Sequence, residues 1–257
     1  SQLNDKLKEN GKSIIVFSSY SNFEYIKKLL KNNLYEYKTL ETKRIFFEEL
    51  YSIEIKKSNI LQKISKEKVT NLKYYTKGKH SIILKSKYKQ KDTIIKTGDF
   101  KHIQLEELFL EKLQKEQFVP KLYFKGGEFI IMQEIKGIDI QYFIEQNNNK
   151  QELIKVFNNI LQITQKLDEI GINKFELTNP RKHIFIENDL SIKFIDFERT
   201  LFTKKPKNTT QILEYIRRIK DRLAKNDIYI DTNKLFEISK NYKNKRFEIK
   251  FEDLLMG

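Results

Sequence analysis

The sequence contains no cysteine and no tryptophan, and only 3 prolines and 8 glycines among its 257 residues. Without cysteine, the chain can form no disulfide, no thiolate zinc site and no cysteine nucleophile. It also lacks an apolar run of membrane-spanning length, and its polar start, Ser1–Gly11, has no signal-peptide core. We therefore expect a cytoplasmic protein that has no membrane partner.

What the chain does contain is enough apolar and aromatic residues to fold. Hydrophobic residues make up 39% of the sequence and aromatic residues 12%, which is too much for a disordered chain. Lys+Arg 50 against Asp+Glu 35 leaves a net charge of +15. This excess suggests an anionic partner such as RNA, the ribosome or a nucleotide. An AT-rich coding sequence, which favours lysine, asparagine and isoleucine, would produce the same excess.

The first seventy residues are predicted to form an accessory α/β segment. Ser13–Phe17 is typical of a strand, and a helix is expected to begin after an N-cap at Ser21. A further helix is expected within Lys43–Leu61, because its apolar residues recur at helical spacing (Ile45, Phe46, Leu50, Ile53).

From about Leu72 the pattern changes to strands and then to helices. The first part predicts strands and one helix (strands within Lys73–Tyr88, Thr93–Lys96, Val119–Phe124 and Glu128–Glu134; helix Gln104–Gln117). After Gly137 helices predominate around a small hairpin (helices Gln141–Gln146, Gln151–Ile170 and Thr209–Lys225; strands Lys182–Ile186 and Ser191–Ile195). This order is typical of a two-lobed kinase.

Three elements of a nucleotide-phosphate site occur in order along the first part. Gly78 and Ser81 lie in a turn between two strands, where backbone could approach phosphates, although a glycine in a hairpin turn has an ordinary explanation. Lys96 ends the returning strand, at a position suited to contact with phosphates. Glu106 on the next helix, or its neighbour Glu107, would orient that lysine.

The strongest local signal is an acidic residue at the end of an apolar strand. Ile192–Ile195 runs directly into Asp196-Phe197-Glu198. Packing alone would not place a carboxylate there, whereas Mg²⁺ requires hard oxygen ligands. We therefore predict that Asp196 is a ligand of Mg²⁺.

A catalytic loop is expected between Glu176 and His183. Glu176 would orient the attacking hydroxyl, and Arg181 or Lys182 would neutralise the transferring phosphoryl group. His183 occupies the place of a second metal ligand, although it is equally explained as the first residue of a strand.

Taken together, these residues resemble the protein-kinase-like superfamily over residues 72 to 223. The motifs Glu-Leu-x-x-Pro-x-Lys-His and Ile-Asp-Phe-Glu-Arg look most like small archaeal-type Ser/Thr kinases related to the RIO kinases and to the kinase of the KEOPS complex. The resemblance implies ATP and Mg²⁺ as cofactors, with Lys96 on the α- and β-phosphates and paired with Glu106. It also implies an adenine hinge entered through the strand Ile130–Ile135, with Met132 as gatekeeper and with contacts from Glu134 and Ile135.

The sequence departs from that family at several positions. Lys174-Phe175-Glu176 replaces the usual His-Arg-Asp, and Glu198 replaces the glycine of Asp-Phe-Gly. Counting back from His183 by the family's spacing reaches Thr178 instead of Glu176, and no Ala-Pro-Glu motif follows. These differences favour slow turnover, autophosphorylation or an ATPase-like activity over rapid phosphorylation of peptides.

We therefore expect an α+β, two-lobed protein-kinase-like fold with a minimal C-lobe and an N-terminal α/β extension. The expected domains are 1–70 (accessory), 71–136 (N-lobe) and 137–257 (C-lobe). The leading functional hypothesis is an atypical Ser/Thr kinase that acts on a protein or on itself. The alternatives are a pseudokinase scaffold for RNA or the ribosome, and a small-molecule kinase on the same fold.

Overall fold

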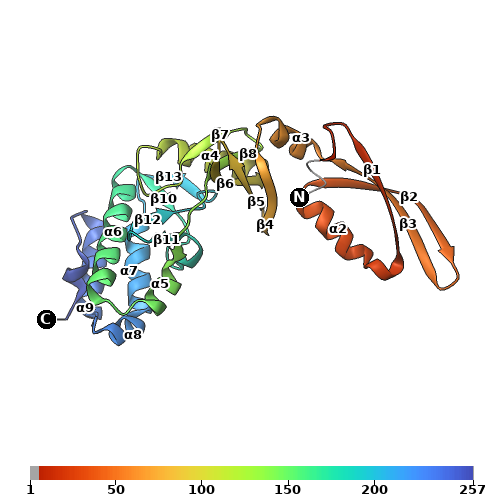
Figure 1. Cartoon of the computed structure of the whole chain (residues 1–257). Coiled ribbons are helices and arrows are strands. Elements are labelled where there is room, and N and C mark those ends of the chain that lie inside the picture. Colours follow the sequence, from red (N-terminus) through yellow and green to blue (C-terminus); the bar gives the residue numbers. More distant parts are fainter. Residues whose placement is uncertain (1–5, 257) are drawn as a thin grey trace. The chain divides into compact units, whose positions relative to one another are not determined.

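The computed structural model describes residues 6–256, which form two compact units (Figure 1). The first unit comprises the chain up to Gln104 together with Leu122–Glu134, and the second comprises Leu105–Lys121 and the chain from Ile135 onward. The first five residues of the polar start, for which no signal peptide is predicted, lie outside the described part.

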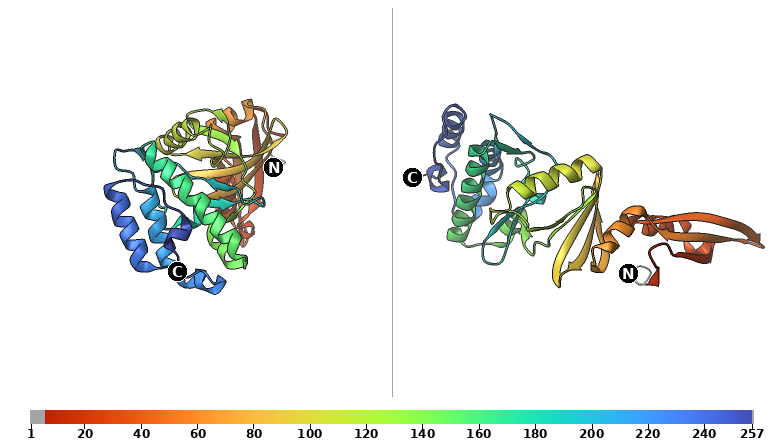
Figure 2. Two further views of the ribbon diagram at one scale, coloured as in Figure 1. Left: turned by 90° about the vertical axis from the view of Figure 1, so that its left-hand side faces the viewer. Right: turned by 90° about the horizontal axis from the view of Figure 1, so that it is seen from above.

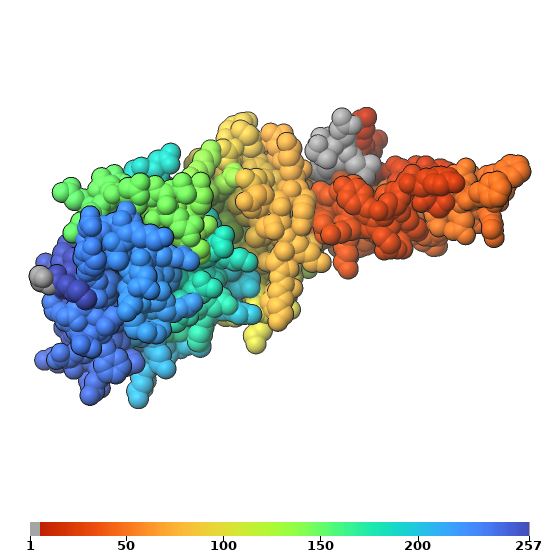
Figure 3. All heavy atoms as spheres, turned by 90° about the horizontal axis from the view of Figure 1, so that it is seen from below, coloured from red at the N-terminus to blue at the C-terminus, as the bar shows by residue number. Residues whose placement is uncertain are grey.

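The N-terminal part of the first unit is a small antiparallel sheet with one helix. The sheet has the order β1-β3-β2 (β1 Lys12–Ser18, β2 Tyr35–Ile45, β3 Glu48–Lys57). A single 3₁₀ turn, η1 (Ser19–Ser21), leads toward α2 (Phe23–Asn32), which packs on one face of the sheet around Leu30, Ile53 and Ile55. Figure 3 shows this segment in red to orange, and several of its large apolar side chains are exposed (Ile14, Val16, Tyr20, Tyr25, Phe46, Phe47).

The helix predicted within Lys43–Leu61 is wrong, because most of that segment is the strand β3. Ile53 and Ile55 are both fully buried, two residues apart, which is the period of a strand with one covered face. A helix, α3 (Asn59–Lys66), begins only after Ser58, whose hydroxyl accepts a hydrogen bond from the Leu61 N–H. The predicted N-cap at Ser21 is also wrong, because the side chain of Asn22 caps α2.

The rest of the first unit is a five-stranded antiparallel sheet that confirms the predicted strands. Its order is β4-β5-β6-β8-β7 (β4 Thr70–Lys77, β5 Ser81–Tyr88, β6 Lys91–Gly98, β7 Leu122–Lys125, β8 Phe129–Gln133). Residues of its inner strands share one hydrophobic core with α3 (Leu61, Ile64, Leu84, Ile95, Ile131). Apolar side chains of α3 pack against those of the sheet, and this contact joins the N-terminal part of the unit to these strands.

The second unit is mainly helical. Its helices follow α4, which begins in the first unit (α4 Phe100–Lys112, α5 Ile140–Gln146, α6 Lys150–Glu169, α7 Asn208–Arg218, α8 Lys220–Leu223, α9 Thr232–Asn244). Three single turns of 3₁₀ helix accompany them (η2 Pro180–Lys182, η3 Ala224–Asn226, η4 Phe251–Leu254). Figures 1 and 2 both show α6, α7 and α9 side by side, as their contacts require.

Two small sheets lie within this second unit. Strands β12, β11 and β9 form one of them (β9 Ile138–Asp139, β11 Ile184–Ile186, β12 Ile192–Phe194), and β10 pairs with β13 in the other (β10 Ile172–Lys174, β13 Thr200–Phe202). Gly171 follows α6 with a φ of 74°, the left-handed conformation that commonly ends a helix. The predicted hairpin and the predicted mixed α+β class are thereby confirmed.

Two predicted helices differ from the observed ones in detail. Helix α4 starts and ends earlier than predicted. The predicted helix Thr209–Lys225 ends at Arg218, and no N-cap side chain bonds to its first turn. The side chain of Asp168 on α6 fills that role from a distant part of the sequence.

Between residues 6 and 256, none of the helices is both long enough and apolar enough to cross a lipid bilayer.

Candidate active site

The turn between β4 and β5 is held by a glycine other than the predicted one. The Gly78 N–H donates to the Ser81 carbonyl at 2.8 Å, and a Cβ at Gly78 would lie 3.4 Å from the Ser81 hydroxyl, which is ordinary contact. At Gly98 on β6, by contrast, a Cβ would lie 2.1 Å from the His80 carbonyl oxygen. Gly98 is therefore required for the turn to pack against β6, although no sequence motif marks it.

Lys96 lies on the central strand of this sheet. It pairs with Ile83 on one side and Ile130 on the other, and only 4% of its surface is exposed. Ser81, also buried, lies opposite Gly98 in the same pairing register. The first unit thus places the predicted turn and the predicted lysine on adjacent strands.

Two histidines stack beside this turn. The rings of His80 and His102 lie 4.3 Å apart and nearly parallel, and the His102 Nδ1 is 2.9 Å from the Asp99 carboxylate. The hydrogen bonds from His102 lower the pKa of Asp99. The start of α4 is thereby attached to the turn through ring stacking and an ionised side chain.

The predicted hinge residues lie at and after the end of β8. Met132 is buried, whereas Glu134 and Ile135 are partly exposed. The Glu134 carboxylate accepts a hydrogen bond from the Lys85 ammonium at 2.6 Å, which raises the pKa of Lys85. Glu134 therefore helps to fix the end of β8 to β5.

The structure distinguishes between the two candidate glutamates of α4. Glu106 is 1% exposed, whereas its neighbour Glu107 is only partly buried. Burying a carboxylate is costly unless charges or hydrogen bonds compensate. Glu106 is therefore the one of the two whose position calls for a specific partner.

Asp196 lies just beyond the buried strand β12. The Phe194 N–H donates to the Phe118 carbonyl and the Ile195 N–H to the His183 carbonyl, which fix the strand end from both sides. Phe197 is fully buried, so the side chain of Asp196 is left at the surface of the core, half-buried. Its φ of 63° is a left-handed conformation that non-glycine residues rarely adopt.

Three carboxylates meet at this point. Oxygen atoms of Glu106, Asp196 and Glu198 all lie within 4.8 Å of one another. Glu198 appeared in the sequence only as a departure from the usual glycine, yet the structure places it beside the predicted metal ligand. The spacing Asp-x-Glu at the strand end is the signal that would have identified it. We call these three residues the carboxylate cluster.

A buried lysine supports the backbone of this cluster. Lys174 on β10 is 1% exposed, its ammonium donates to the Asp196 carbonyl, and it lies 4.9 Å from the centre of the Phe197 ring. In the sequence, Lys174 is marked only by its replacement of the usual histidine. In the structure it links β10 to the strand end that carries Asp196.

Glu176 lies at the surface near a cation that sequence reasoning did not select. Its carboxylate accepts a hydrogen bond from Arg199 at 2.7 Å and lies 3.4 Å from the His183 Nε2. His183 is buried, and its Nδ1 is 4.0 Å from the Asp196 carboxylate. Glu176, like Asp196, has a positive φ, 73°. His183 therefore lies between these two acids without belonging to the carboxylate cluster.

The two cations predicted for the loop are both exposed. The Arg181 Nε lies 4.0 Å from the Asp139 carboxylate, and Lys182 closes the short turn η2. The structure thus brings Arg199, rather than either of them, to Glu176. Their predicted roles toward a phosphoryl group stay predictions.

A separate network of hydrogen bonds around Asp168 supports strand β10, which precedes Glu176. This carboxylate accepts hydrogen bonds from the Asn208 N–H and side-chain amide, from the Thr209 N–H and from the Tyr242 hydroxyl. Asn208 in turn accepts the Lys174 N–H at 2.7 Å. Burial raises the pKa of Tyr242 to about 12. Asp168 therefore connects α6, α7 and α9 to the strand that carries Lys174.

Comparison with known proteins places this geometry in context. No profile of a known protein family matches the chain, and no curated protein matches it. Solved structures of a Rio2 kinase from Chaetomium thermophilum do match. The ADP/Mg²⁺–phosphoaspartate complex is 13% identical with a TM-score of 0.51, and covers 82% of this chain and 72% of that one. A second Rio2 structure has 13% identity, a TM-score of 0.50, and coverage of 78% and 70%.

The chain has an atypical-kinase-like fold. The predicted fold class is thus confirmed, including its two-lobed kinase architecture. At this identity the likeness concerns the fold alone.

Proposed function

We propose that this protein is an ATP- and Mg²⁺-dependent phosphotransferase, an atypical Ser/Thr kinase that acts on a protein or on its own chain. The proposal assigns residues 71–136 to the N-lobe, 137–257 to a reduced C-lobe and 1–70 to an accessory segment. A relation to small archaeal-type kinases and to the KEOPS kinase is part of the same proposal.

The observation that carries it is the carboxylate cluster. Three carboxylates within 4.8 Å form a set of hard oxygen donors, which suits Mg²⁺ better than softer metals. Like charges at this separation repel by about 3–4 kcal/mol per pair at an effective dielectric constant of 20, and a cation between them would reduce that repulsion. The residues present therefore fit a bound Mg²⁺.

In this proposal Asp196 and Glu198 hold the metal, and Glu106 lies beside them and pairs with Lys96. Bound Mg²⁺ would neutralise phosphate charge and orient the transferring group. Lys96 contacts the α- and β-phosphates, and the β4–β5 turn with Gly78 and Ser81 covers them. Met132, Glu134 and Ile135 contribute to the adenine hinge.

On the acceptor side, Glu176 orients the attacking hydroxyl. The hydrogen bond from Arg199 fixes the direction of its carboxylate, and His183 lies 3.4 Å away as a second contact. Arg199, Arg181 and Lys182 supply positive charge for the transferring phosphoryl group. Phosphorylation of a Ser or Thr of the chain itself is included in this reaction.

Thermal unfolding with Mg²⁺-ATP tests the proposal. A ligand that binds only the folded state at 100 times its Kd stabilises it by about 2.7 kcal/mol. We expect Mg²⁺-ATP to raise the Tm, ATP with excess chelator to raise it less, and Asp196→Asn to abolish the Mg²⁺-dependent part. Asp189→Asn, in the exposed turn of the same hairpin, is the matched control. An unchanged Tm at millimolar Mg²⁺-ATP would refute the proposal.

One observation favours a second function, a pseudokinase that binds nucleotide and serves as an RNA- or ribosome-bound scaffold. The only predicted catalytic carboxylate, Glu176, is exposed and held in an ion pair with Arg199. A single-turnover assay with labelled ATP separates the two functions. Transfer of phosphate that disappears in Glu176→Gln supports the kinase, whereas binding without transfer, together with salt-sensitive RNA binding, supports the scaffold.

A further inference from the structure

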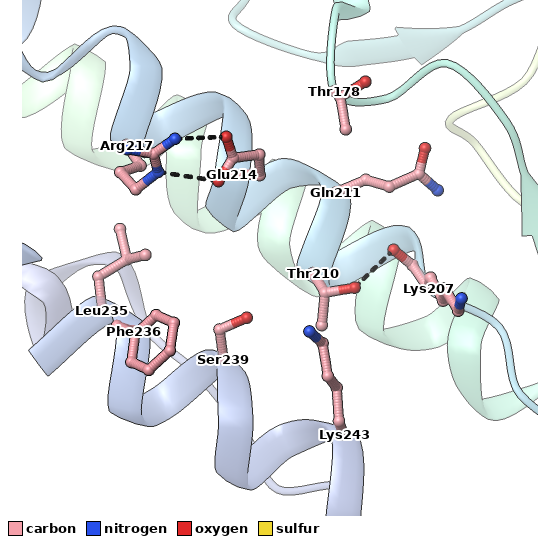
Figure 4. A pocket seen from close by; sticks show the side chains of 10 residues that line it. All are labelled: Thr178, Lys207, Thr210, Gln211, Glu214, Arg217, Leu235, Phe236, Ser239 and Lys243. Atoms are coloured by element: carbon pink, nitrogen blue, oxygen red, sulfur yellow. Dashed lines mark hydrogen bonds and ion pairs between the residues drawn. The ribbon is translucent and has the colours of Figure 1, made fainter.

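A cavity of about 670 Å³ opens between α7 and α9 (Figure 4). Its size is that of sites that bind compact ligands or a few side chains. Helix α7 and the residue before it line one wall, α9 lines the other, and the loop after β10 closes one side (Lys207, Thr210, Gln211, Glu214, Arg217; Leu235, Phe236, Ser239, Lys243; Thr178). We call it the α7–α9 cavity.

The charged residues of this cavity leave an excess of positive charge. The Arg217 guanidinium donates two hydrogen bonds to Glu214, at 2.7 and 2.9 Å, which lower the pKa of Glu214 and cancel its charge. Lys207 and Lys243 remain, and within residues 6–256 neither ammonium forms an ion pair with a carboxylate. The cavity therefore attracts an anionic group.

The uncharged side chains add two other kinds of contact. Phe236 is 70% exposed, an unusual state for a phenylalanine on a helix that packs against another. In Figure 4 the Ser239 hydroxyl points into the space between the helices, whereas the Thr210 hydroxyl donates to the Lys207 carbonyl at 3.0 Å. An apolar side chain that covers Phe236 and a polar group near the Ser239 hydroxyl would make both kinds of contact.

The cavity continues toward Glu176. A second cavity of about 790 Å³ is lined by Phe175, Glu176, Arg199 and Leu201, and Thr178 and Gln211 line both. The Gln211 side chain accepts the Leu177 N–H and donates to the Lys174 carbonyl, so it fixes the wall between the two cavities. A ligand in the α7–α9 cavity therefore lies next to the proposed acceptor site.

We propose that the α7–α9 cavity binds an acidic polypeptide segment of the phosphate acceptor, with its carboxylates toward Lys207 and Lys243 and an apolar side chain on Phe236. The assignment of this segment to the acceptor rests on the proposed kinase function. The binding itself depends only on the cavity.

These features favour a peptide over RNA. Nucleic-acid sites that lack sequence preference combine a long basic groove with several stacking aromatics. Here a single aromatic lies in a short cavity between two helices, and the one arginine is already paired with Glu214. Arginine forks are the preferred phosphate contacts, whereas lysine ammonium groups and hydroxyls suit carboxylates and peptide groups equally well.

Fluorescence anisotropy with the full chain tests the proposal. The probes are a short labelled peptide rich in Asp and Glu with one Leu and one Ser, a basic peptide of equal length, and a short single-stranded RNA. We expect the acidic peptide to bind and Lys243→Glu to weaken it by about tenfold at low salt. Phe236→Ser should weaken it at both low and physiological salt, because apolar contact is not screened.

Lys234→Glu is the matched control, since Lys234 lies on α9 and is exposed but does not line the cavity. Its net charge change equals that of Lys243→Glu, and at physiological salt we expect a smaller loss of affinity than for Lys243→Glu, because Lys234 does not line the cavity and salt weakens indirect charge effects most. Equal weakening by both variants would overturn the proposal, because net charge alone would then explain binding. Tighter binding of RNA that Lys243→Glu weakens, or no binding of the acidic peptide, would also overturn it.

The same assay separates this inference from the proposed function. Asp196→Asn should leave the peptide affinity unchanged, because it alters only the carboxylate cluster. If peptide binding depends on Lys243 while Mg²⁺-ATP fails to bind, the kinase proposal fails and the cavity is a docking site of a scaffold. If nucleotide binds and the peptide does not, the docking proposal alone fails.

Discussion

The second unit contains two groups of acidic side chains that differ in what surrounds their carboxylates. Asp168 is surrounded by donors, which come from the first residues of α7 and from Tyr242 on α9. The carboxylate cluster differs in that oxygen atoms of three acids, Glu106, Asp196 and Glu198, lie within 4.8 Å of one another. Both groups contain a carboxylate that is 1% exposed (Asp168 and Glu106).

The proposed function assigns the carboxylate cluster to a ligand, whereas the hydrogen bonds of Asp168 assign that residue to the fold. A buried carboxylate that accepts several charge-assisted hydrogen bonds stabilises the folded state. Carboxylates that approach one another oppose folding when all are ionised, and they are retained where a cation or another function compensates. Replacing acids in the two groups should therefore have opposite effects on stability, and the predictions below test that contrast.

The largest expected effect is that of Asp168→Ala. It leaves buried N–H groups at the start of α7 without an acceptor, at a cost of about 1–3 kcal/mol for each unsatisfied group. We expect a loss of about 3 kcal/mol or more in the free energy of unfolding by urea. Asp221→Ala, at an exposed position on α8, should lose less than about 1 kcal/mol. Similar losses in the two variants would contradict the structural role of Asp168.

Lys174→Met should have an intermediate effect. It retains the buried aliphatic volume but removes the donor to the Asp196 carbonyl and the contact with the Phe197 ring. We expect a loss of about 1–3 kcal/mol in unfolding free energy and a weaker Mg²⁺-dependent rise in Tm. Lys204→Met, at an exposed position after β13, serves as the control. If Lys174→Met kept the full Mg²⁺-dependent rise in Tm, Lys174 would have no role in metal binding at the carboxylate cluster.

Glu198→Gln should weaken Mg²⁺ binding by about tenfold, or about 1.4 kcal/mol, because it removes one of the three charges. Without metal, the variant should unfold at the same or a higher Tm, since repulsion within the carboxylate cluster is reduced. Glu187→Gln on the same hairpin is the control. A lower Tm without metal, combined with unchanged Mg²⁺ affinity, would assign Glu198 to the fold instead.

The smallest effect is a pH dependence at the Asp168 network. Burial raises the pKa of Tyr242 from 10 to about 12 in the folded state, so the neutral hydroxyl stabilises the fold. That contribution is complete below pH 10 and is lost as the pH rises toward 12. Unfolding free energy measured between pH 9 and 12 should therefore fall more steeply for the native chain than for Tyr242→Phe, by on the order of 1 kcal/mol. Tyr20→Phe, at an exposed position, should follow the native curve.

The strands and helices around the site could be predicted because each has a local signal. Apolar alternation marks the five-stranded sheet, and an apolar strand that runs into an acid marks Asp196. The wrong helix prediction within Lys43–Leu61 also has a local cause, because Leu50 and Ile53 fit a helical period whereas Ile53 and Ile55 fit a strand. Only the pairing of this segment with β1 and β2 decides between the two.

The residues that sequence reasoning missed are those whose partners are remote along the chain. Asp168 caps α7 across 40 residues, and Gln211 holds the Leu177 N–H across 34. Neither side chain has a neighbour in sequence that reveals its role. Glu198 and Arg199 both stand in the motif Ile-Asp-Phe-Glu-Arg. Comparison with the usual kinase motif marks Glu198 only as the replacement of a glycine, and it assigns no role to Arg199.

The close approach of Gly98 to His80 has a mechanical consequence for the nucleotide end of the proposed site. Because no side chain fits at Gly98, the tip of the β4–β5 turn rests directly on the backbone of β6, two residues beyond Lys96. The Asp99 N–H also donates to the His80 carbonyl at 2.8 Å, so movement of the turn tip would break contacts with the strand that carries the lysine. A phosphate chain bound as proposed would therefore contact the turn and Lys96 at a spacing that these backbone contacts set.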